Sequence, residues 1–170
     1  CRVIPNRGSW LDFEYDVKDF LYFKIDRKKK IFSSTLLLAL GYTKAEIIDE
    51  FYESEQYTFD PKTEKWKTKF NPENYKAKNF SEEVIDAKTG EIVIKLGDKI
   101  NFLNAKKLAN EGLKDILVSR ESLFGKFLHR DIKINDEEDG IFKIGTELND
   151  TIIQQILDAN IHTLQISVTN

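Results

Sequence analysis

The sequence predicts an α+β fold, and three observations support this prediction. Apolar residues alternate with polar ones over residues 11–15 and again over residues 21–25, which is typical of half-buried strands. Residues 33–52 combine short apolar runs with helix start and stop signals. Residues 84–168 contain two similar segments that each read as strand, helix and strand. We therefore expect a hairpin-rich part with two short helices, followed by a pseudo-repeated strand–helix–strand module.

The first two strands are expected to form a hairpin, because the polar turn Asp16–Asp19 between them is short. If Asp16 faces Phe20, all the apolar residues of the two strands lie on one face, which we expect to be the core face. They are Leu11, Phe13, Tyr15, Leu21, Phe23 and Ile25. The same register places Trp10 opposite Asp26 on the other, polar face. A Trp there is typical of a stacking platform for bases, but a Trp at a strand end also commonly covers the sheet edge.

Two short helices are expected after this hairpin, and we expect both to cap it. Residues 33–41 form an apolar run with a serine at the N-cap and Gly41 as the stop. Thr43 and Glu46 have the spacing of a capping box, which opens a second helix that runs to about Tyr52. The inner face of the second helix is expected to carry Ile47, Ile48 and Phe51.

A second hairpin is expected from the alternation over residues 56–59 and 65–70. Trp66, Thr68 and Phe70 share the apolar phase of the second of these strands, while lysines occupy the other phase. We therefore expect Trp66 to be a core residue.

A polar stretch and an internal repeat predict two domains. Residues 71–80 lack periodicity, so we place a linker there, between a domain of residues 1–70 and a domain of residues 81–170. Two segments of the second domain, about residues 84–119 and 132–168, each have a turn, strands, and an amphipathic helix ended by Gly or Asn before a last strand. Since neither copy is long enough to bury its own apolar face, we expect one pseudo-symmetric module.

Charge is unevenly distributed along the chain. The formal net charge is −3, but residues 1–31 hold eight Lys or Arg against five Asp or Glu, whereas residues 131–170 hold two against eight. A polyanion is therefore expected to prefer the N-terminal part. The sequence has no run of eighteen apolar residues, so it predicts no transmembrane helix. Its single cysteine, Cys1, predicts no disulfide framework. Because methionine is absent from the sequence, we expect an excised piece of a larger cytosolic protein.

The sequence predicts no catalytic, metal or cofactor residue. Asp12, Glu14 and Asp16 share a strand face, and paired carboxylates can act as acid and base, but alternating acids are also typical of a solvated face. His129 and His162 are isolated from any second metal-ligand cluster, and we expect each to be an ordinary surface or loop residue.

Several motifs in a fixed order resemble one known family. Residues 2–16 read RVIPNRGSWLDFEYD, and KIDRKKK at 24–30 and LALGY at 38–42 follow them. This ordered set closely resembles the lobe region of the bacterial RNA polymerase β subunit. The resemblance is strongest over residues 1–53, and the remainder resembles the external, lineage-variable insertion of that family.

The resemblance implies that this part of the chain guides DNA and makes no bonds. In the family, the region faces downstream duplex DNA and the displaced non-template strand, and the matching Trp stacks on an unpaired non-template base. The implied DNA-binding residues are Trp10 as the stacking residue, Asp26 in the same pocket, and Arg7, Arg27 and Lys28 as charges that face phosphates. The chain departs from the family at Asn6, commonly Tyr, and at Lys28–Lys30, commonly richer in Arg. Lysine keeps the charge but lacks the bidentate fork of arginine.

The resemblance also implies a cellular setting. The expected partners are DNA and the other polymerase subunits, namely β′, α and a sigma factor, in the cytoplasm, in association with the nucleoid and away from membranes. Catalytic magnesium is expected elsewhere in the parent nucleotidyltransferase. We expect the acidic insertion to dock proteins, because its charge repels nucleic acid.

Two other functions remain open from the residues alone. The chain could be a stand-alone cytosolic protein-interaction module, with Trp10 as a binding hot spot. It could also be a hydrolase, which would require Asp12 or Glu14 to be essential for turnover.

Overall fold

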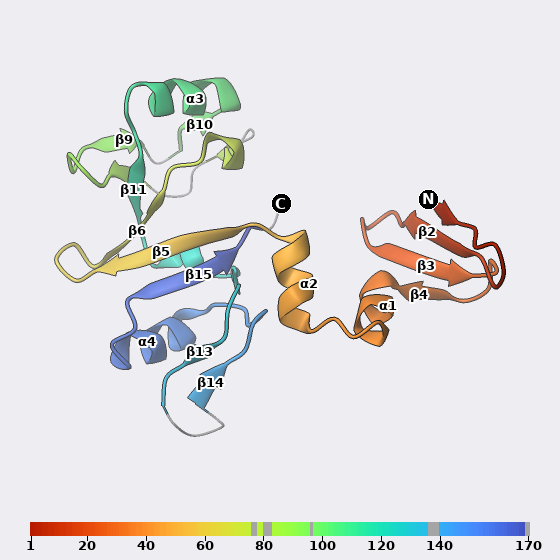
Figure 1. Ribbon diagram of the computed structural model, residues 1–170. Helices are drawn as coiled ribbons and strands as arrows, with labels where there is room; N and C mark the ends of the chain where they lie inside the picture. Colours follow the sequence, from red (N-terminus) through yellow and green to blue (C-terminus); the bar gives the residue numbers. More distant parts are fainter. Residues whose placement is uncertain (76–77, 80–82, 96, 136–139, 169–170) are drawn as a thin grey trace. The chain divides into compact units, whose positions relative to one another are not determined.

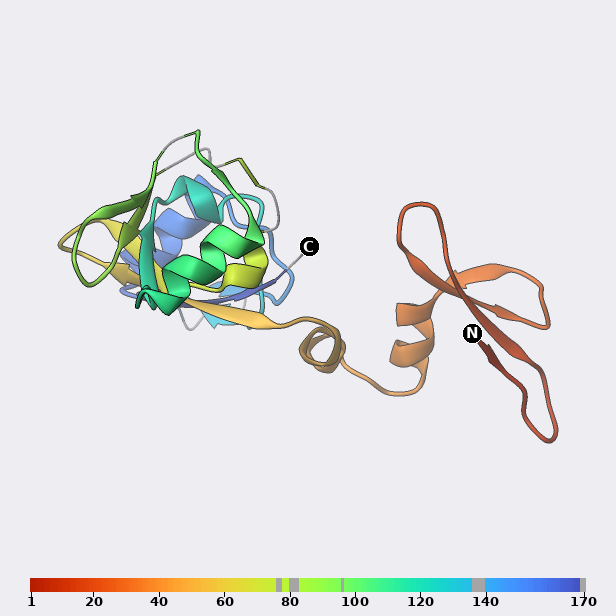
Figure 2. The ribbon, with the colours of Figure 1, turned by 90° about the horizontal axis from the view of Figure 1, so that it is seen from above.

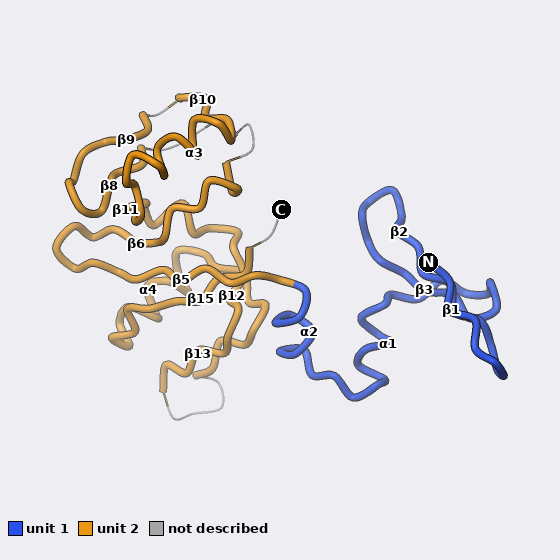
Figure 3. Tube along the Cα trace, turned by 45° about the horizontal axis from the view of Figure 1, so that its top comes forward, with its two compact units in different colours: residues 1–51 blue, residues 52–170 orange. Residues whose placement is uncertain are grey.

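The computed structural model describes residues 1–75, 78–79, 83–95, 97–135 and 140–168. The chain divides into two compact units, residues 1–51 and residues 52–170, which Figure 3 colours separately. Within the described ranges, four α-helices are combined with antiparallel strands in several sheets. The predicted α+β class is therefore confirmed.

The first unit is a four-stranded antiparallel sheet followed by two helices. Its elements are β1 (Arg2–Val3), β2 (Leu11–Tyr15), β3 (Leu21–Ile25), β4 (Lys30–Phe32), α1 (Ser33–Ala39) and α2 (Lys44–Phe51). The strands lie in the order β1-β2-β3-β4, and the ribbon of β2 and β3 is strongly twisted (Figure 2). Phe13 pairs with Phe23 and Asp12 with Lys24, which is the register that the parity of the apolar residues predicts.

Local capping interactions fix the boundaries of the two helices. Thr43 and Glu46 form the predicted capping box: the Glu46 carboxylate accepts the Thr43 N–H at 2.7 Å, and the Thr43 hydroxyl oxygen accepts the Glu46 N–H at 3.2 Å. Gly41 adopts φ +98° directly after α1, as expected for a stop. The predicted serine N-cap is wrong, because β4 runs directly into α1 and Phe32 takes the N-cap position without a side-chain hydrogen bond.

The first unit buries little apolar surface within itself. Among residues 1–51, all of which are described, Phe23 is the one hydrophobic residue that is buried. The prediction of a continuous core face is wrong for Tyr15 and Ile25, which are 70% and 42% exposed, and Phe51 of α2 is also exposed. The reason is the position of the helices: α1 packs against β3 and β4, whereas α2 packs against α1. Part of the apolar face therefore has no covering layer within the unit.

The second unit is built around a seven-stranded antiparallel sheet. Its elements are β5 (Ser54–Asp60), β6 (Lys65–Lys69), the 3₁₀ helix η1 (Pro72–Asn74), β7 (Lys78–Asn79), β8 (Val84–Asp86), β9 (Ile92–Ile94), β10 (Lys99–Ile100), α3 (Phe102–Asn110), β11 (Asp115–Val118), the 3₁₀ helix η2 (Glu121–Leu123), β12 (Phe127–Leu128), β13 (Ile132–Lys133), β14 (Ile141–Phe142), α4 (Asp150–Asp158) and β15 (Thr163–Ser167). The strand order is β12-β15-β5-β6-β11-β8-β9, so the hairpin of β5 and β6 lies at the centre. Helices α3 and α4 lie on either side of this hairpin in Figure 1.

In each half of this unit, a pair of strands precedes a helix and a last strand. Asn101 caps α3 and Asn149 caps α4, and each side chain accepts a backbone N–H three residues further on at 2.9 Å. The strand after α3, β11, pairs with β6, and the strand after α4, β15, pairs with β5. In the same way, β8 pairs with β9 and β13 pairs with β14. The expected turn that begins at Asp136 lies outside the described residues.

One hydrophobic core joins the two halves through the central hairpin. Trp66 of β6 is fully buried, as predicted, and Thr68 and Phe70 are buried on the same side of the strand. Ala105 of α3 and Ile153 of α4, both fully buried, belong to the same cluster. Among the described residues, neither half therefore has a separate core.

The division between the units differs from the linker expected at residues 71–80, because it falls between Phe51 and Tyr52. Residues 54–69 supply the two central strands of the second unit's sheet. Alternation along the sequence identifies this hairpin but does not indicate which sheet it joins.

Candidate nucleic-acid interface

Trp10 and Asp26 lie opposite each other at one end of the β2–β3 ribbon. The Trp10 N–H donates to Asp26 Oδ1 at 2.8 Å, and the Asp26 N–H donates to the Trp10 carbonyl oxygen at 3.0 Å. Trp10 is 40% exposed. The two predicted site residues are therefore adjacent, and two hydrogen bonds fix the backbone of the Trp while its ring stays at the surface.

The turn between β3 and β4 is built from residues in an unusual backbone conformation. Asp26 and Arg27 have φ +50° and +58°, and the Lys28 N–H donates to the Ile25 carbonyl oxygen at 3.0 Å. Positive φ at two central positions is usual for Asn, Asp and Gly and is strained for Arg. The strained turn projects Arg27 and Lys28, both exposed, from the end of the ribbon that carries Trp10.

Hydrogen bonds keep the Asp26 carboxylate ionised. The bond from the Ser9 hydroxyl, followed by the bond from the Trp10 N–H, lowers the pKa of Asp26 below its ordinary value, and the charge of Lys28 adds to this effect. Desolvation opposes the shift but does not reverse it. Asp26 is therefore a fixed acceptor that holds the segment before β2 against the turn after β3.

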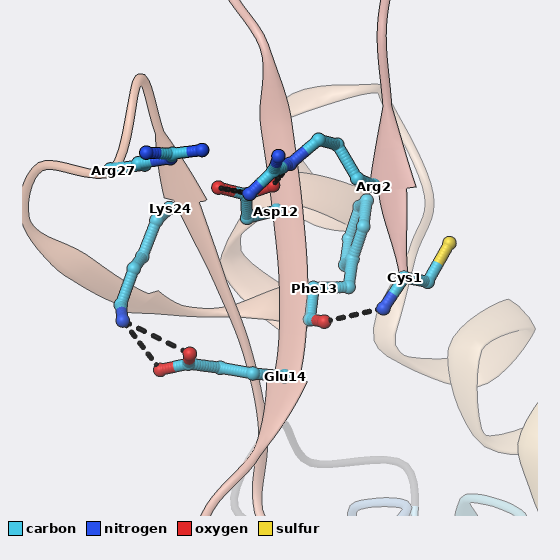
Figure 4. A pocket seen from close by; sticks show the side chains of 7 residues that line it. All are labelled: Cys1, Arg2, Asp12, Phe13, Glu14, Lys24 and Arg27. Atoms are coloured by element: carbon cyan, nitrogen blue, oxygen red, sulfur yellow. Dashed lines mark hydrogen bonds and ion pairs between the residues drawn. The ribbon is translucent and has the colours of Figure 1, made fainter.

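Arg2 lies over the indole ring of Trp10. Its guanidinium carbon is 5.4 Å from the ring centroid, which is the geometry of a cation–π contact. The same guanidinium pairs with the Asp12 carboxylate through Nε and Nη2, as Figure 4 shows. Arg2 is not predicted from the sequence, because β1 is two residues long and shows no alternation. Its position opposite Asp12 follows from the register of β1 and β2.

Ion pairs occupy the middle of the polar face. Lys24 Nζ lies 2.9 Å and Lys30 Nζ 3.4 Å from Glu14 Oε1. The bond from Arg2 lowers the pKa of Asp12, and the bond from Lys24 lowers that of Glu14. Both carboxylates are therefore ionised at neutral pH, and neither is suited to act as a general acid.

A shallow pocket joins these ion pairs to the basic turn. It is lined by Cys1, Arg2, Asp12, Phe13, Glu14, Lys24 and Arg27 (Figure 4). Among the residues predicted to face phosphates, Arg27 lies at this pocket, and its charge contributes to the lowered pKa of Asp12. Lys28 follows it in the turn, and Arg7 lies exposed in the loop between β1 and β2.

The two histidines lie in the second unit and in different environments. His129 lies in the loop after β12, as one of the two expected placements has it, but it is not a surface residue: it is 3% exposed, and its Nδ1 is 3.0 Å from the Ser167 hydroxyl oxygen. The backbone N–H of His129 donates to the Gln165 carbonyl oxygen of β15 at 2.9 Å, which holds this segment against the sheet. His162 is exposed and contacts the Phe59 ring.

The described residues contain neither a candidate metal site nor a candidate membrane-spanning helix. Across those residues, no group of three or more His, Cys, Asp or Glu side chains is arranged to hold a metal ion. In the same residues, no helix has both the length and the apolar character needed to cross a bilayer.

Comparisons with known proteins give one consistent result. No protein-family model matches the chain. It is 41% identical over all 170 residues to the protein named DNA-directed RNA polymerase subunit beta in Rickettsia prowazekii, and equally similar to the proteins of that name in Rickettsia conorii and Rickettsia felis. The chain spans only 12% of the length of each of these relatives.

Proposed function

The chain belongs to the family of bacterial RNA polymerase β subunits, of which it matches one segment, and we propose that this segment guides DNA during transcription. The alternative of a stand-alone interaction module has less support, because the whole chain aligns within a much longer protein. In this proposal, the first unit contacts unpaired and downstream DNA as part of the assembled enzyme.

The observation that supports this proposal best is the presentation of Trp10. The ring is exposed, its backbone is fixed by Asp26, and Arg2 lies over one ring face. An unpaired base can stack on the ring, and stacking of this kind contributes about 1 to 3 kcal/mol per base without selecting its identity. We propose that the base belongs to the non-template strand and that Asp26 borders its pocket.

Phosphate contacts are assigned to the exposed cations near Trp10. Arg7, Arg27 and Lys28 are all exposed, whereas Lys24 and Lys30 are already paired with Glu14. Contacts of this kind add affinity that falls with salt, and they carry no sequence information. The proposed surface therefore holds the strand without reading it.

Bond formation is assigned to other parts of the assembled enzyme. We propose that nucleotidyl transfer and its magnesium ions lie outside this segment, with the β′ and α subunits and a sigma factor as partners in the bacterial cytoplasm and nucleoid. The ion-paired state of Asp12 and Glu14 agrees with a supporting role for this face.

We assign the second unit a different role, which is to dock proteins. The eight Asp or Glu against two Lys or Arg over residues 131–170 support this assignment, because such a charge repels DNA. Crosslinking in an elongating complex tests it, and crosslinks from this unit mainly to DNA would contradict it.

The experiment for the first unit compares polymerases reconstituted with full-length β subunits. With Trp10→Ala, we expect Kd for DNA with an unpaired non-template strand to rise about 5- to 150-fold, and Kd for fully paired DNA to stay the same. Trp10→Phe keeps a ring and is expected to retain most of the affinity. Tyr15→Ala removes an exposed ring from the opposite sheet face and serves as the matched control. Equal binding by the Trp10→Ala and Tyr15→Ala enzymes would contradict the proposal.

A further inference from the structure

A second group of aromatic rings lies on the same sheet face as Trp10. We call Phe20, Tyr22 and Phe32 the aromatic trio. The Tyr22 and Phe32 rings are stacked, with centroids 4.5 Å apart, and Phe20 meets Phe32 edge to face at 5.9 Å. Tyr22 pairs with Glu14 and with Phe32 across the strands, in the same phase that places Trp10 opposite Asp26.

The trio is unusual because two of its three rings are exposed, while Tyr22 is half-buried. Phe20 is 50% and Phe32 is 49% exposed, in the strand phase opposite to the buried Phe23. Two large rings held in contact at a surface form a preorganised apolar patch, and patches of this kind commonly mark binding sites. The role proposed for Trp10 does not use these rings.

The charges around the trio favour a polyanionic partner. Lys30 Nζ lies 4.4 Å from the centroid of the Tyr22 ring, and Lys30 and Lys24 together face the single carboxylate of Glu14. The exposed Arg27 and Lys28, which follow Tyr22 and precede Phe32 in the sequence, add further positive charge at the end of the ribbon that carries Trp10. Aromatic rings that alternate with cations along a strand face are the usual composition of surfaces that bind single-stranded nucleic acid.

One base of the unpaired DNA strand stacks on Trp10 in the proposed function. We propose that a second unpaired base of the same strand stacks on the aromatic trio. Glu14, the pairing partner of Tyr22, lies four residues beyond Trp10 in β2, which corresponds to about 13 Å at ~3.3 Å per residue. The DNA strand then runs along the β2–β3 sheet face from Trp10 to the aromatic trio and passes the cations of Lys24 and Lys30. This inference rests on the proposed function of Trp10 and extends it to a second site.

The test uses assembled polymerase and bubble DNA with 5-iodouracil placed at each unpaired non-template position in turn. This base forms photocrosslinks with aromatic side chains that stack on it. We expect one position to crosslink to Trp10 and a second, a few nucleotides away, to crosslink to Phe20 or Phe32. A double variant, Phe20→Ala with Phe32→Ala, is expected to lose the second crosslink, keep the first, and weaken binding of the unpaired strand by about 5- to 150-fold.

Two further variants make the result specific. Phe20→Tyr with Phe32→Tyr keeps both rings and is expected to keep the crosslink and the affinity, while Tyr15→Ala on the opposite face is expected to change neither. A crosslink at Trp10 with none at the trio would overturn this inference and leave the proposed function intact. Crosslinks at neither site would overturn both this inference and the proposed function. Crosslinks from the trio to a protein would also overturn this inference, because they would show that the trio binds a protein partner and not the DNA strand.

Discussion

At the scale of single residues, the neighbours of Trp10 determine how its ring is presented. Asp26 fixes its backbone through two hydrogen bonds, and Arg2 lies over the ring while paired with Asp12. A ring held in this way loses little conformational freedom when a base stacks on it, so more of the stacking energy appears as affinity. In the proposed function, Asp26 therefore has two roles: it holds the backbone of Trp10 in position, and it borders the pocket of the base.

The lowered pKa of Asp26 leads to a prediction about pH. Because the pKa of Asp26 is lowered, its ionised carboxylate stabilises the folded arrangement at pH values above the ordinary Asp pKa of about 3.9. This stabilisation is lost as the pH falls through the lowered pKa. In a carbon NMR titration of the 170-residue chain, we expect the Asp26 carboxyl to titrate below about pH 3.9. The Trp10 indole signal is expected to shift over the same pH range.

Ser9→Ala is the matched variant for this titration, because the Ser9 hydroxyl is the largest cause of the shift. We expect its Asp26 midpoint to move upward, toward the ordinary value. A midpoint at or above that value in the unsubstituted chain would show that these hydrogen bonds do not hold Asp26 in solution.

The sequence predicts part of this site and misses the rest for physical reasons. Period-two alternation places Trp10 opposite Asp26, because a shift of one residue would expose Phe23. Arg2 and Ser9 are not predicted, since they act from a two-residue strand and an irregular loop that carry no periodic signal. Contacts made by irregular backbone depend on the folded register, so they become visible only in the structure.

At the scale of elements, the capping box is the device that starts α2. Thr43→Ala removes the acceptor for the Glu46 N–H and is expected to destabilise the first turn by about 1 kcal/mol. This predicts roughly fivefold faster hydrogen exchange at the Glu46 amide, measured by NMR. Thr43→Ser retains the hydroxyl and is expected to exchange at nearly the original rate. Equal exchange in the Ala and Ser variants would show that the box does not stabilise the helix.

Local signals identify the elements better than their surroundings. The capping box, the Gly41 stop and the buried phase of Trp66 are all found as predicted, because each depends on a few neighbouring residues. The exposure of Tyr15 and Phe51 depends on which elements cover them. In the same way, the sheet that β5 and β6 join depends on which other strands pair with them. Periodicity identifies an apolar face but does not show what covers it.

At the scale of the whole molecule, the second unit has a single core that two similar halves share. The β5–β6 hairpin pairs with β15 on one side and with β11 on the other, and a single core crosses it. We expect a chain that ends at residue 119 to lose cooperative unfolding and amide protection in β5 and β6, because β15 and half of the core are removed. A chain of residues 52–170 is expected to keep both, because it retains the complete core. Full protection of the hairpin in the shorter chain would contradict the single-core description.

The proposed stacking of an unpaired non-template base on Trp10 can be followed by 2-aminopurine fluorescence. The fluorophore is placed in turn at each unpaired non-template position of a bubble bound to assembled polymerase, where stacking on an aromatic ring quenches it. At one position we expect strong quenching that Trp10→Ala relieves and Trp10→Tyr largely preserves, with Tyr15→Ala unchanged. If Trp10→Ala left the fluorescence unchanged at every position, no base would stack on this ring and the account would be wrong.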